Sequence, residues 1–368
     1  MRYYIIAGEA SGDLHGSNLI KQLHVLDANA NIRCWGGDLM KAEGATIVKH
    51  YKDLAFMGFV EVLMNLRTIL KNIDFCKKDI TSFKPDILIL IDYPGFNIRI
   101  AEWAKKEGIK TVYYISPQIW AWKENRVHTI KKYVDKMLVI LPFEKDFYGK
   151  WNYEVEYVGH PLVEVIDNFK LKHPKEETVG KKIIALLPGS RKQEINVKLP
   201  VMLEVSKAFP DYEFVVAKAP GMEDSFYEPF LIKYGNVSAL AGKTYDVLNK
   251  ATAALVTSGT ATLEAALFGV PEVVCYKGNP ISYRIAKWVI KVKYISLVNL
   301  IMDKAVVKEL IQDEMTTENC TKELRELLEN TDRKKQLEKD YTDLKNLLSQ
   351  GGNASANAAK IISDFVKK

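Results

Sequence analysis

Two polar turns, each following an apolar run, hold the residue types best suited to binding an anion. One begins the stretch Thr257–Leu267 (TSGTATLEAAL), after the apolar run Ala253–Val256. The other is PGSR at 188–191, after the apolar run Ile183–Leu187. Free N–H groups at a helix start attract phosphate, and an arginine can fork onto it. The two turns therefore predict one pyrophosphate site, although the first also fits an N-capped structural helix.

An acidic residue at the end of a different predicted strand is the candidate general base. Pro85–Ile91 (PDILILI) is a continuous apolar run, typical of a strand buried on both faces, and Asp92 follows it. The carboxyl end of a central parallel strand is where open α/β folds place their chemistry. The alternative role is an N-cap for a helix over Ile98–Lys106, which Asn97 would serve better.

Two further turns follow predicted strands. Tyr3–Ala7 leads into a glycine-rich turn whose Gly8, Gly12 and Gly16 spacing does not match GxGxxG, so a dinucleotide site is disfavoured. A tight turn between strand and helix explains these glycines equally well. After Thr111–Ile115, the stretch SPQIWAW puts two tryptophans in a turn, which is unusual for packing alone.

The order of apolar runs, turns and amphipathic stretches predicts the architecture. Two successive series of alternating strands and helices predict two Rossmann-like parallel-sheet domains, an α/β fold in which both domains face a cleft. We expect an N-terminal domain over 1–166, a polar linker over 167–182, a C-terminal domain over 183–345 and a final helical segment over 346–368.

Composition narrows the function classes. Of the 368 residues, 27% are charged and the net charge is +6, an excess too diffuse to argue for nucleic acid. The four cysteines are scattered and the six histidines lack metal-ligand spacing, so neither disulfides nor a metal site are expected. The N-terminus does not resemble a signal peptide and no apolar run could span a membrane, so we expect a cytoplasmic protein.

Two stretches could contact lipid. Met57–Leu70 (MGFVEVLMNLRTIL) is apolar on nearly every helical face, which fits either a buried helix or one that meets a membrane. Ile281–Val292 combines basic residues with Trp288 and fits either a membrane-surface helix or a solvated face.

Taken together, several motifs resemble the lipid-A-disaccharide synthase family, over about residues 5 to 312. They are IAGEASGD, MGFVEVL, IDYPGFN, SPQIWAWKENR, YVGHPL, LLPGSRKQEI, SGTATLEA, YKGNP, SLVNLI and ELIQ. The resemblance implies a GT-B glycosyltransferase fold whose last helix crosses back to the first domain.

The resemblance also implies an activity. An inverting hexosyltransferase, needing no metal or cofactor, would join UDP-2,3-diacylglucosamine to the 6-hydroxyl of 2,3-diacylglucosamine 1-phosphate. The products would be a β-1,6 disaccharide and UDP, in the lipid A (lipopolysaccharide) biosynthesis of Gram-negative bacteria. The enzyme would lie peripherally on the cytosolic face of the inner membrane, and the family tendency is toward a homodimer.

Within the resemblance, Asp92 and Arg191 match the essential acid and arginine. The donor UDP-sugar would contact Ser190, Arg191, Ser258, Gly259, Thr260, Ala261, Thr262, Glu264, Asn299 and Gln312, with Glu264 at the ribose. We place on the acceptor side Gly8, Glu9, Ser11, Gly12, Asn97 and Trp120. Contact with lipid or membrane is assigned to Met57, Phe59, Val60, Leu63, Leu66 and Trp288.

Two positions depart from the family pattern: Gly95 stands where a second acid is often found, and Lys308 where a proline is common.

Two other functions remain open. Another GT-B enzyme, such as a soluble N-acetylglucosamine transferase or a 2-epimerase, would share the phosphate turns without needing an apolar surface. A non-catalytic carrier of lipid or nucleotide sugar would have no use for Asp92.

Overall fold

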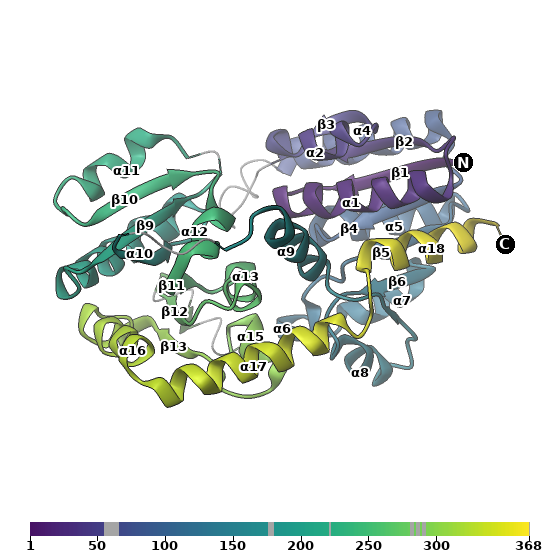
Figure 1. Ribbon diagram of the computed structural model, residues 1–368. Helices are drawn as coiled ribbons and strands as arrows, with labels where there is room; N and C mark the ends of the chain where they lie inside the picture. Colours follow the sequence, from purple (N-terminus) through teal and green to yellow (C-terminus); the bar gives the residue numbers. More distant parts are fainter. Residues whose placement is uncertain are drawn as a thin grey trace. The chain divides into compact units, whose positions relative to one another are not determined.

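The computed structural model describes residues 1–54, 66–175, 180–220, 222–279, 283–284, 288 and 292–367 (Figure 1). The chain divides into two compact units. The first unit comprises Met1–Pro161 and Leu348–Lys368, and the second comprises Leu162–Leu347.

The first unit is built on a seven-stranded parallel sheet in the order β3-β2-β1-β4-β5-β6-β7. Its strands are β1 (Arg2–Ala7), β2 (Asn31–Gly36), β3 (Thr46–His50), β4 (Ile87–Ile91), β5 (Thr111–Tyr114), β6 (Lys136–Val139) and β7 (Glu156–Tyr157). All five residues of β4 are buried, as expected for a strand covered on both faces. The predicted central strand before Asp92 is confirmed.

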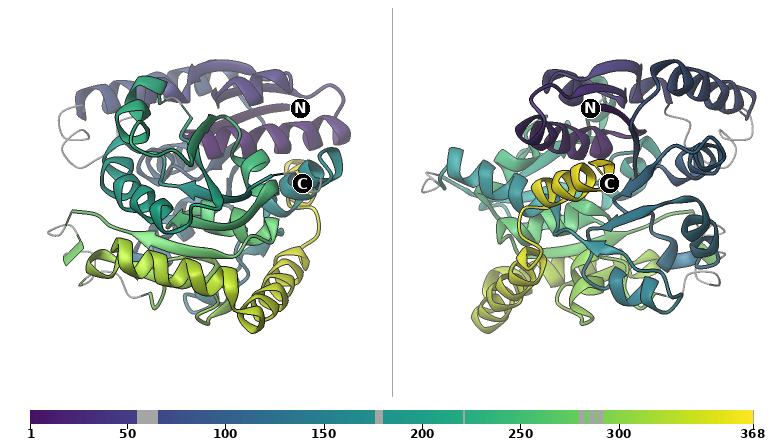
Figure 2. Two further views of the ribbon diagram at one scale, coloured as in Figure 1. Left: turned by 60° about the vertical axis from the view of Figure 1, so that its left-hand side comes forward. Right: turned by 90° about the vertical axis from the view of Figure 1, so that its right-hand side faces the viewer.

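Helices link these strands, and the end of the chain returns to cover the same sheet. They are α1 (Ala10–Leu26), α2 (Asp38–Ala42), α4 (Leu66–Phe83), α5 (Pro94–Lys106), α6 (Ile119–Trp122), α7 (Arg126–Tyr133), α8 (Glu144–Gly149) and α18 (Ala354–Lys367), with a 3-10 turn η1 (Tyr51–Leu54). Helix α18 lies beside α1 in each view (Figures 1 and 2). Its Ala358 and Ile362 join the core over β1, so the predicted crossing of the last helix is confirmed.

The second unit holds a six-stranded parallel sheet in the order β10-β9-β8-β11-β12-β13. The strands are β8 (Lys182–Leu187), β9 (Tyr212–Lys218), β10 (Val237–Ala241), β11 (Ala251–Thr257), β12 (Glu272–Tyr276) and β13 (Lys308–Ile311). The helices are α9 (Pro161–Lys172), α10 (Lys192–Val205), α11 (Asp224–Leu231), α12 (Thr244–Lys250), α13 (Thr260–Phe268), α15 (Leu297–Met302), α16 (Thr317–Glu329) and α17 (Thr331–Ser349), with 3-10 turns η2 (Ser206–Ala208) and η3 (Gln312–Glu314).

Each sheet has one place where the strand order reverses, and parallel sheets bind ligands outside the strand ends at such a point. In the first sheet, β1 and β4 are neighbours there, with Ala7 opposite Ile91. In the second sheet, β8 and β11 are neighbours, with Leu187 opposite Val256. Of the five loops selected by sequence as ligand sites, four leave these four strand ends, and the fifth, with the tryptophans, follows β5.

One predicted helix start is wrong, and the first part of the predicted linker is helical. Helix α5 begins at Pro94 rather than Ile98, because proline at the first helical position already has a helical φ. Asn97 therefore lies inside the helix and does not cap it. The predicted linker over 167–182 begins as helix α9, which runs to Lys172. Its apolar anchor is Phe169, whose ring packs against Tyr245 and Phe268.

The stretch predicted as a basic helix is described only in part. Ser296 caps a separate helix, α15, by accepting a hydrogen bond from the backbone N–H of Asn299, and residues 292–296 before it are not helical. The side chains of Met57, Phe59, Val60, Leu63 and Leu66 lie outside the described residues. Among the helices that are described, none is long and apolar enough to span a bilayer.

Candidate active site

Asp92 follows β4 directly and sits in a turn with an unusual backbone. Its φ is +43° and that of Tyr93 is +49°, so two consecutive non-glycine residues are left-handed. Two side chains fix this turn through the backbone carbonyl of Asp92. Asn97 Nδ2 donates to it at 2.7 Å and Tyr113 Oη at 2.6 Å. Left-handed backbone persists only where its surroundings determine it, so this turn is held in place.

The environment of Asp92 suits a proton acceptor. Burial raises the pKa of Asp92 from 3.8 to about 7, and the nearby Glu9 carboxylate adds to the rise. A carboxyl with this pKa exchanges protons near neutrality, as general base catalysis requires. Glu9, assigned by sequence to the acceptor side, therefore acts on the candidate base electrostatically.

The glycines of the first loop pack against protein. A Cβ at position 8 would lie 2.4 Å from Cγ of Tyr93, and one at position 12 would lie 3.0 Å from the Cβ of Ala7. Gly8 thus admits the Tyr93 ring and Gly12 lets α1 approach β1. Ser11 is exposed at the start of α1 and is free to face a ligand.

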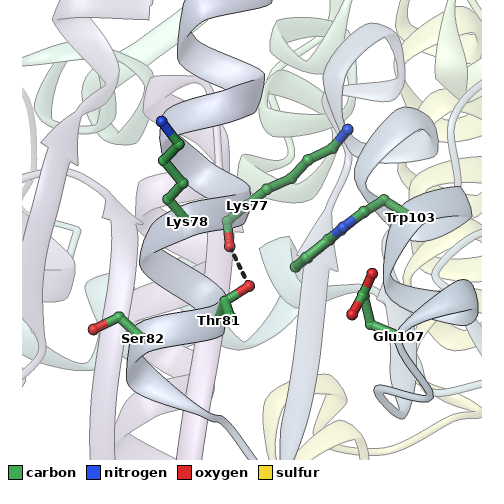
Figure 3. Close-up of a pocket in the computed structure, with 6 residues that line it drawn as sticks. All are labelled: Lys77, Lys78, Thr81, Ser82, Trp103 and Glu107. Carbon is green, nitrogen blue, oxygen red and sulfur yellow. Dashed lines mark hydrogen bonds between the residues drawn. The ribbon is translucent and has the colours of Figure 1, made fainter.

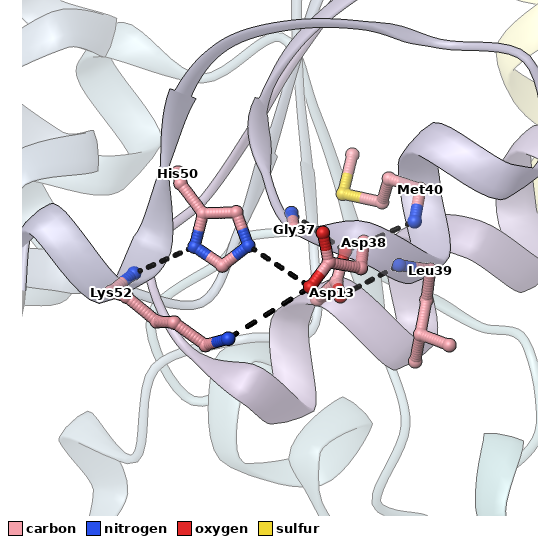
Figure 4. A network of polar contacts seen from close by, with 7 residues as sticks. All are labelled: Asp13, Gly37, Asp38, Leu39, Met40, His50 and Lys52. Atoms are coloured by element: carbon pink, nitrogen blue, oxygen red, sulfur yellow. Dashed lines mark hydrogen bonds and ion pairs between the residues drawn. The ribbon is translucent and has the colours of Figure 1, made fainter. Parts of the chain in front are cut away.

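Asp13, the last residue of the IAGEASGD motif, is structural (Figure 4). It is buried, and its carboxylate accepts hydrogen bonds of 2.8 Å from Gly37 N and of 3.1 Å from Leu39 N and Met40 N. It thereby caps α2 from α1. Asp38 points outward beside His50 and Lys52.

Two further acceptor-side residues are buried. Asn97 is fully buried, and its amide also donates to the carbonyl of Ile91 at 3.2 Å, so it positions the strand end. Trp120 lies in α6 with its ring edge-on to Phe143, at 5.0 Å between centroids, and is 7% exposed. Trp122 of the same turn is the exposed tryptophan. The side chains of Asn97 and Trp120 are both buried, and their assignment to the acceptor side stays a prediction.

The two phosphate turns are adjacent, as predicted. They follow β8 and β11, which pair directly. Arg191 is the N-cap residue of α10, with its side chain 61% exposed and a guanidinium nitrogen 3.6 Å from Glu194. Ser190 beside it is exposed. A solvent-exposed ion pair with this separation between Arg191 and Glu194 is weak, so the Arg191 guanidinium is available to a ligand.

Two hydroxyls of the turn that starts α13 form hydrogen bonds within the protein. Ser258 donates to the carbonyl of Ile295 at 2.7 Å, and the buried Thr262 donates to that of Gly259 at 2.8 Å. Both hydroxyls therefore hold the loop. Thr260 and Gly259 are exposed and Ala261 is half-buried, so the start of α13 is open where its first N–H groups have no helical partner.

Glu264 lies one turn into α13, as predicted. Its carboxylate accepts a hydrogen bond of 3.1 Å from the hydroxyl of Tyr245. Burial raises the pKa of Glu264, while the Tyr245 bond lowers it. The half-buried carboxylate keeps acceptor capacity for a diol.

The two remaining donor-side residues differ in role. Asn299 is buried, donates to Val307 O and Glu309 Oε1 and accepts from Val307 N, each at 2.9 Å. Its side chain is therefore engaged within the protein. Gln312 accepts a 3.0 Å hydrogen bond from Gly278 N, while its Nε2 is buried without a hydrogen-bond partner in the described residues. That nitrogen is a donor available to a ligand.

Sequence reasoning missed Lys198, a buried lysine of α10 whose ammonium donates to the hydroxyl of Thr257. No motif marks it, because its position follows from packing between α10 and the ends of β11 and β12.

A surface hollow of about 370 Å³ in the first unit does not belong to this site (Figure 3). It is lined by Lys77, Lys78, Thr81 and Ser82 of α4, with Trp103 and Glu107. These residues lie near the ends of α4 and α5 that lead into β4 and β5, at the edge of the sheet opposite Asp92.

In the part of the chain that the structure describes, no group of three His, Cys, Asp or Glu side chains could hold a metal ion.

Trp288, assigned by sequence to membrane contact, is 90% exposed.

Comparison with solved structures identifies the fold. A UDP-GlcNAc 2-epimerase from Neisseria meningitidis aligns with a TM-score of 0.66 at 13% identity, covering 100% of both chains. A glycosyltransferase of kitacinnamycin aligns at 0.67 and 14% identity, covering 99% of this chain and 98% of that one. The predicted GT-B fold, with two Rossmann-like parallel-sheet domains, is confirmed.

Sequence comparison identifies the family. A lipid-A-disaccharide synthase of Geobacter metallireducens is 38% identical over 100% of this chain and 98% of its own length. That of Syntrophus aciditrophicus is 38% identical over 99% and 97%. The lipid-A-disaccharide synthetase family profile matches residues 3–363. The chain therefore belongs to the lipid-A-disaccharide synthetase family, and its enzymatic class is that of a glycosyltransferase.

Proposed function

We propose that this chain transfers 2,3-diacylglucosamine from its UDP derivative to the 6-hydroxyl of 2,3-diacylglucosamine 1-phosphate. The products are the β-1,6-linked lipid A disaccharide 1-phosphate and UDP. Family membership supports the reaction class. The observation that carries the proposal is Asp92, a carboxyl with a pKa of about 7 at the switch point of its sheet.

Asp92 is the proposed general base. A sugar hydroxyl is a poor nucleophile, so a carboxylate must take its proton as the hydroxyl attacks the anomeric carbon. The Asp92 carboxylate removes the proton of the acceptor 6-hydroxyl, the new glycosidic bond forms, and the bond from the anomeric carbon to the UDP oxygen breaks. Asn97 and Tyr113 support this role by fixing the Asp92 backbone.

The second unit is proposed to bind the donor. The UDP that leaves develops negative charge on its β-phosphate, which fixed donors can stabilise. Arg191, Ser190 and the start of α13 at Thr260 supply such donors at one strand edge. We assign Glu264 to the ribose hydroxyls and Gln312 Nε2 to the edge of the same pocket.

Membrane contact belongs to the same proposal. Both substrates carry acyl chains, and the apolar stretch Met57–Leu70 is long enough to serve them. The exposed Trp288 supports a second contact, since tryptophan favours membrane interfaces. We therefore propose peripheral association with the cytosolic face of the inner membrane.

Substrate comparison tests this function. Purified protein is incubated with the acceptor and with either UDP-2,3-diacylglucosamine or UDP-N-acetylglucosamine, and products are identified by mass spectrometry. We expect a disaccharide phosphate from the acylated donor alone. Conversion of UDP-N-acetylglucosamine without use of the acceptor would instead support a 2-epimerase.

A further inference from the structure

Lys198 is a buried cation in the second unit that the reaction as described does not use. It lies two turns into α10 and is 3% exposed. Its Nζ donates a hydrogen bond to Thr257 Oγ1 and faces the Tyr276 ring, 5.7 Å from the centroid. Within the described ranges, no carboxylate forms an ion pair with it.

Such an ammonium is poorly compensated. It has three N–H donors, and burying a charge without an opposite charge is unfavourable. Burial lowers the pKa of Lys198, and Arg191 lowers it further, whereas Glu194 opposes the shift. A methionine would fill the same space without this penalty, so packing alone does not explain a lysine here.

The position of the charge indicates a use. Thr257 and Tyr276 are the last residues of the neighbouring strands β11 and β12, at the edge where parallel sheets bind ligands. Thr257 also immediately precedes the Ser258–Thr260 turn that starts α13. The ammonium therefore lies behind the helix start assigned to the diphosphate, in surroundings that screen charge less than water does.

We propose that Lys198 is a positioning residue for the diphosphate of the nucleotide-sugar donor. Its ammonium holds Thr257, and with it the start of α13, while adding a buried positive charge that favours a dianionic ligand at that turn. This inference rests on the proposed function, because it presumes that the turn receives UDP.

Binding of nucleosides and nucleotides with different numbers of phosphates distinguishes an electrostatic role of Lys198 from a purely structural one. Calorimetry measures the dissociation constants of uridine, UMP and UDP for the wild type and for Lys198→Met, which keeps the length and removes the charge. Lys250→Met is the matched control, since Lys250 is exposed at the end of α12, next to the amino end of β11.

We expect Lys198→Met to weaken UDP binding at least about tenfold and uridine binding less than twofold, with UMP between them. Lys250→Met should leave all three constants unchanged. Equal weakening of uridine and UDP in Lys198→Met would assign Lys198 to structure and overturn the proposal, as would unchanged binding of UDP.

Further variants of Lys198 keep the test decisive if Lys198→Met does not fold. If Lys198→Met does not fold, Lys198→Gln gives the same readout, because glutamine removes the charge and still donates to Thr257. If neither neutral variant folds while Lys198→Arg does, the charge serves the fold and the proposal is wrong. Failure of the proposed function would differ from all of these, because the wild type itself would then bind UDP no better than uridine.

Discussion

The side-chain amide of Asn97 donates a hydrogen bond of 2.7 Å to the backbone carbonyl of Asp92. Asn97 lies in the first turn of α5 and Asp92 directly follows β4, so one contact ties the helix to the turn that carries the candidate base. The backbone of Asp92 is left-handed, a conformation that costs about 1–3 kcal/mol and persists only where its surroundings impose it. Asn97 is therefore part of what imposes it.

Replacing Asn97 should harm both stability and turnover. Asn97→Leu removes the donor to the carbonyls of Ile91 and Asp92, and each lost hydrogen bond costs about 0.5–1.5 kcal/mol, although the Asp92 carbonyl keeps its bond from Tyr113. We expect a lower midpoint in chemical unfolding and reduced turnover in the folded fraction. Asn29→Leu, at an exposed position, is the control. Wild-type turnover in Asn97→Leu would show that the turn does not depend on this amide.

Asp92 should make the fold less stable as pH rises. Its pKa is raised from 3.8 to about 7, so the folded state favours the neutral carboxyl. Below about pH 4 the group is neutral in both folded and unfolded states, and its ionisation lowers stability progressively up to about pH 7. Asp92→Asn should therefore raise the melting temperature by at least about 2 °C more at pH 8 than at pH 4. Equal differences at both pH values would contradict the raised pKa.

Removing Arg191 should slow transfer while leaving the fold intact, since its side chain is largely exposed. We expect Arg191→Ala to lose about 10²–10³ in kcat, as when one donor to a developing charge is removed. Lys192→Ala, which changes the next exposed cation, should stay within about twofold of wild type. Steady-state kinetics provides the comparison, and an Arg191→Ala enzyme with normal kcat would exclude the assigned role.

Trp288 should contribute to membrane binding. Its side chain is 90% exposed, and transfer of such a ring into the interface favours association. In flotation with vesicles containing anionic phospholipid, Trp288→Ala should bind about tenfold more weakly. Leu171→Ala, at a site that is 81% exposed, controls for the loss of any exposed apolar group. Equal losses in both variants would argue against a specific contact at Trp288.

The ends of the strands can be predicted from sequence, because the composition of each segment determines where its strand ends. The run before Asp92 is apolar throughout, and a strand buried on both faces needs that composition. The pairing of the two phosphate turns was also anticipated, since both follow apolar strands. Its register, Leu187 opposite Val256, depends on which strands become neighbours and is not encoded in either segment.

Sequence and structure differ where contacts between distant parts of the chain determine the local structure. Helix α9 extends into a polar segment because Phe169 packs against Phe268, about a hundred residues away in the chain. Asn97 was predicted to cap a helix, although Pro94 marks the true start. Lys198 carries no signal in sequence, because a lysine in a helix is ordinarily exposed and only packing against β11 and β12 buries it.

The most direct test of the account is release of UDP from UDP-2,3-diacylglucosamine, measured with and without 2,3-diacylglucosamine 1-phosphate, for the wild type and Asp92→Asn. We expect rapid, acceptor-dependent release by the wild type and a loss of about 10²–10⁴ in kcat for Asp92→Asn, as for removal of a general base. Full activity of Asp92→Asn at saturating substrates, or wild-type release of UDP that does not depend on the acceptor, would contradict it.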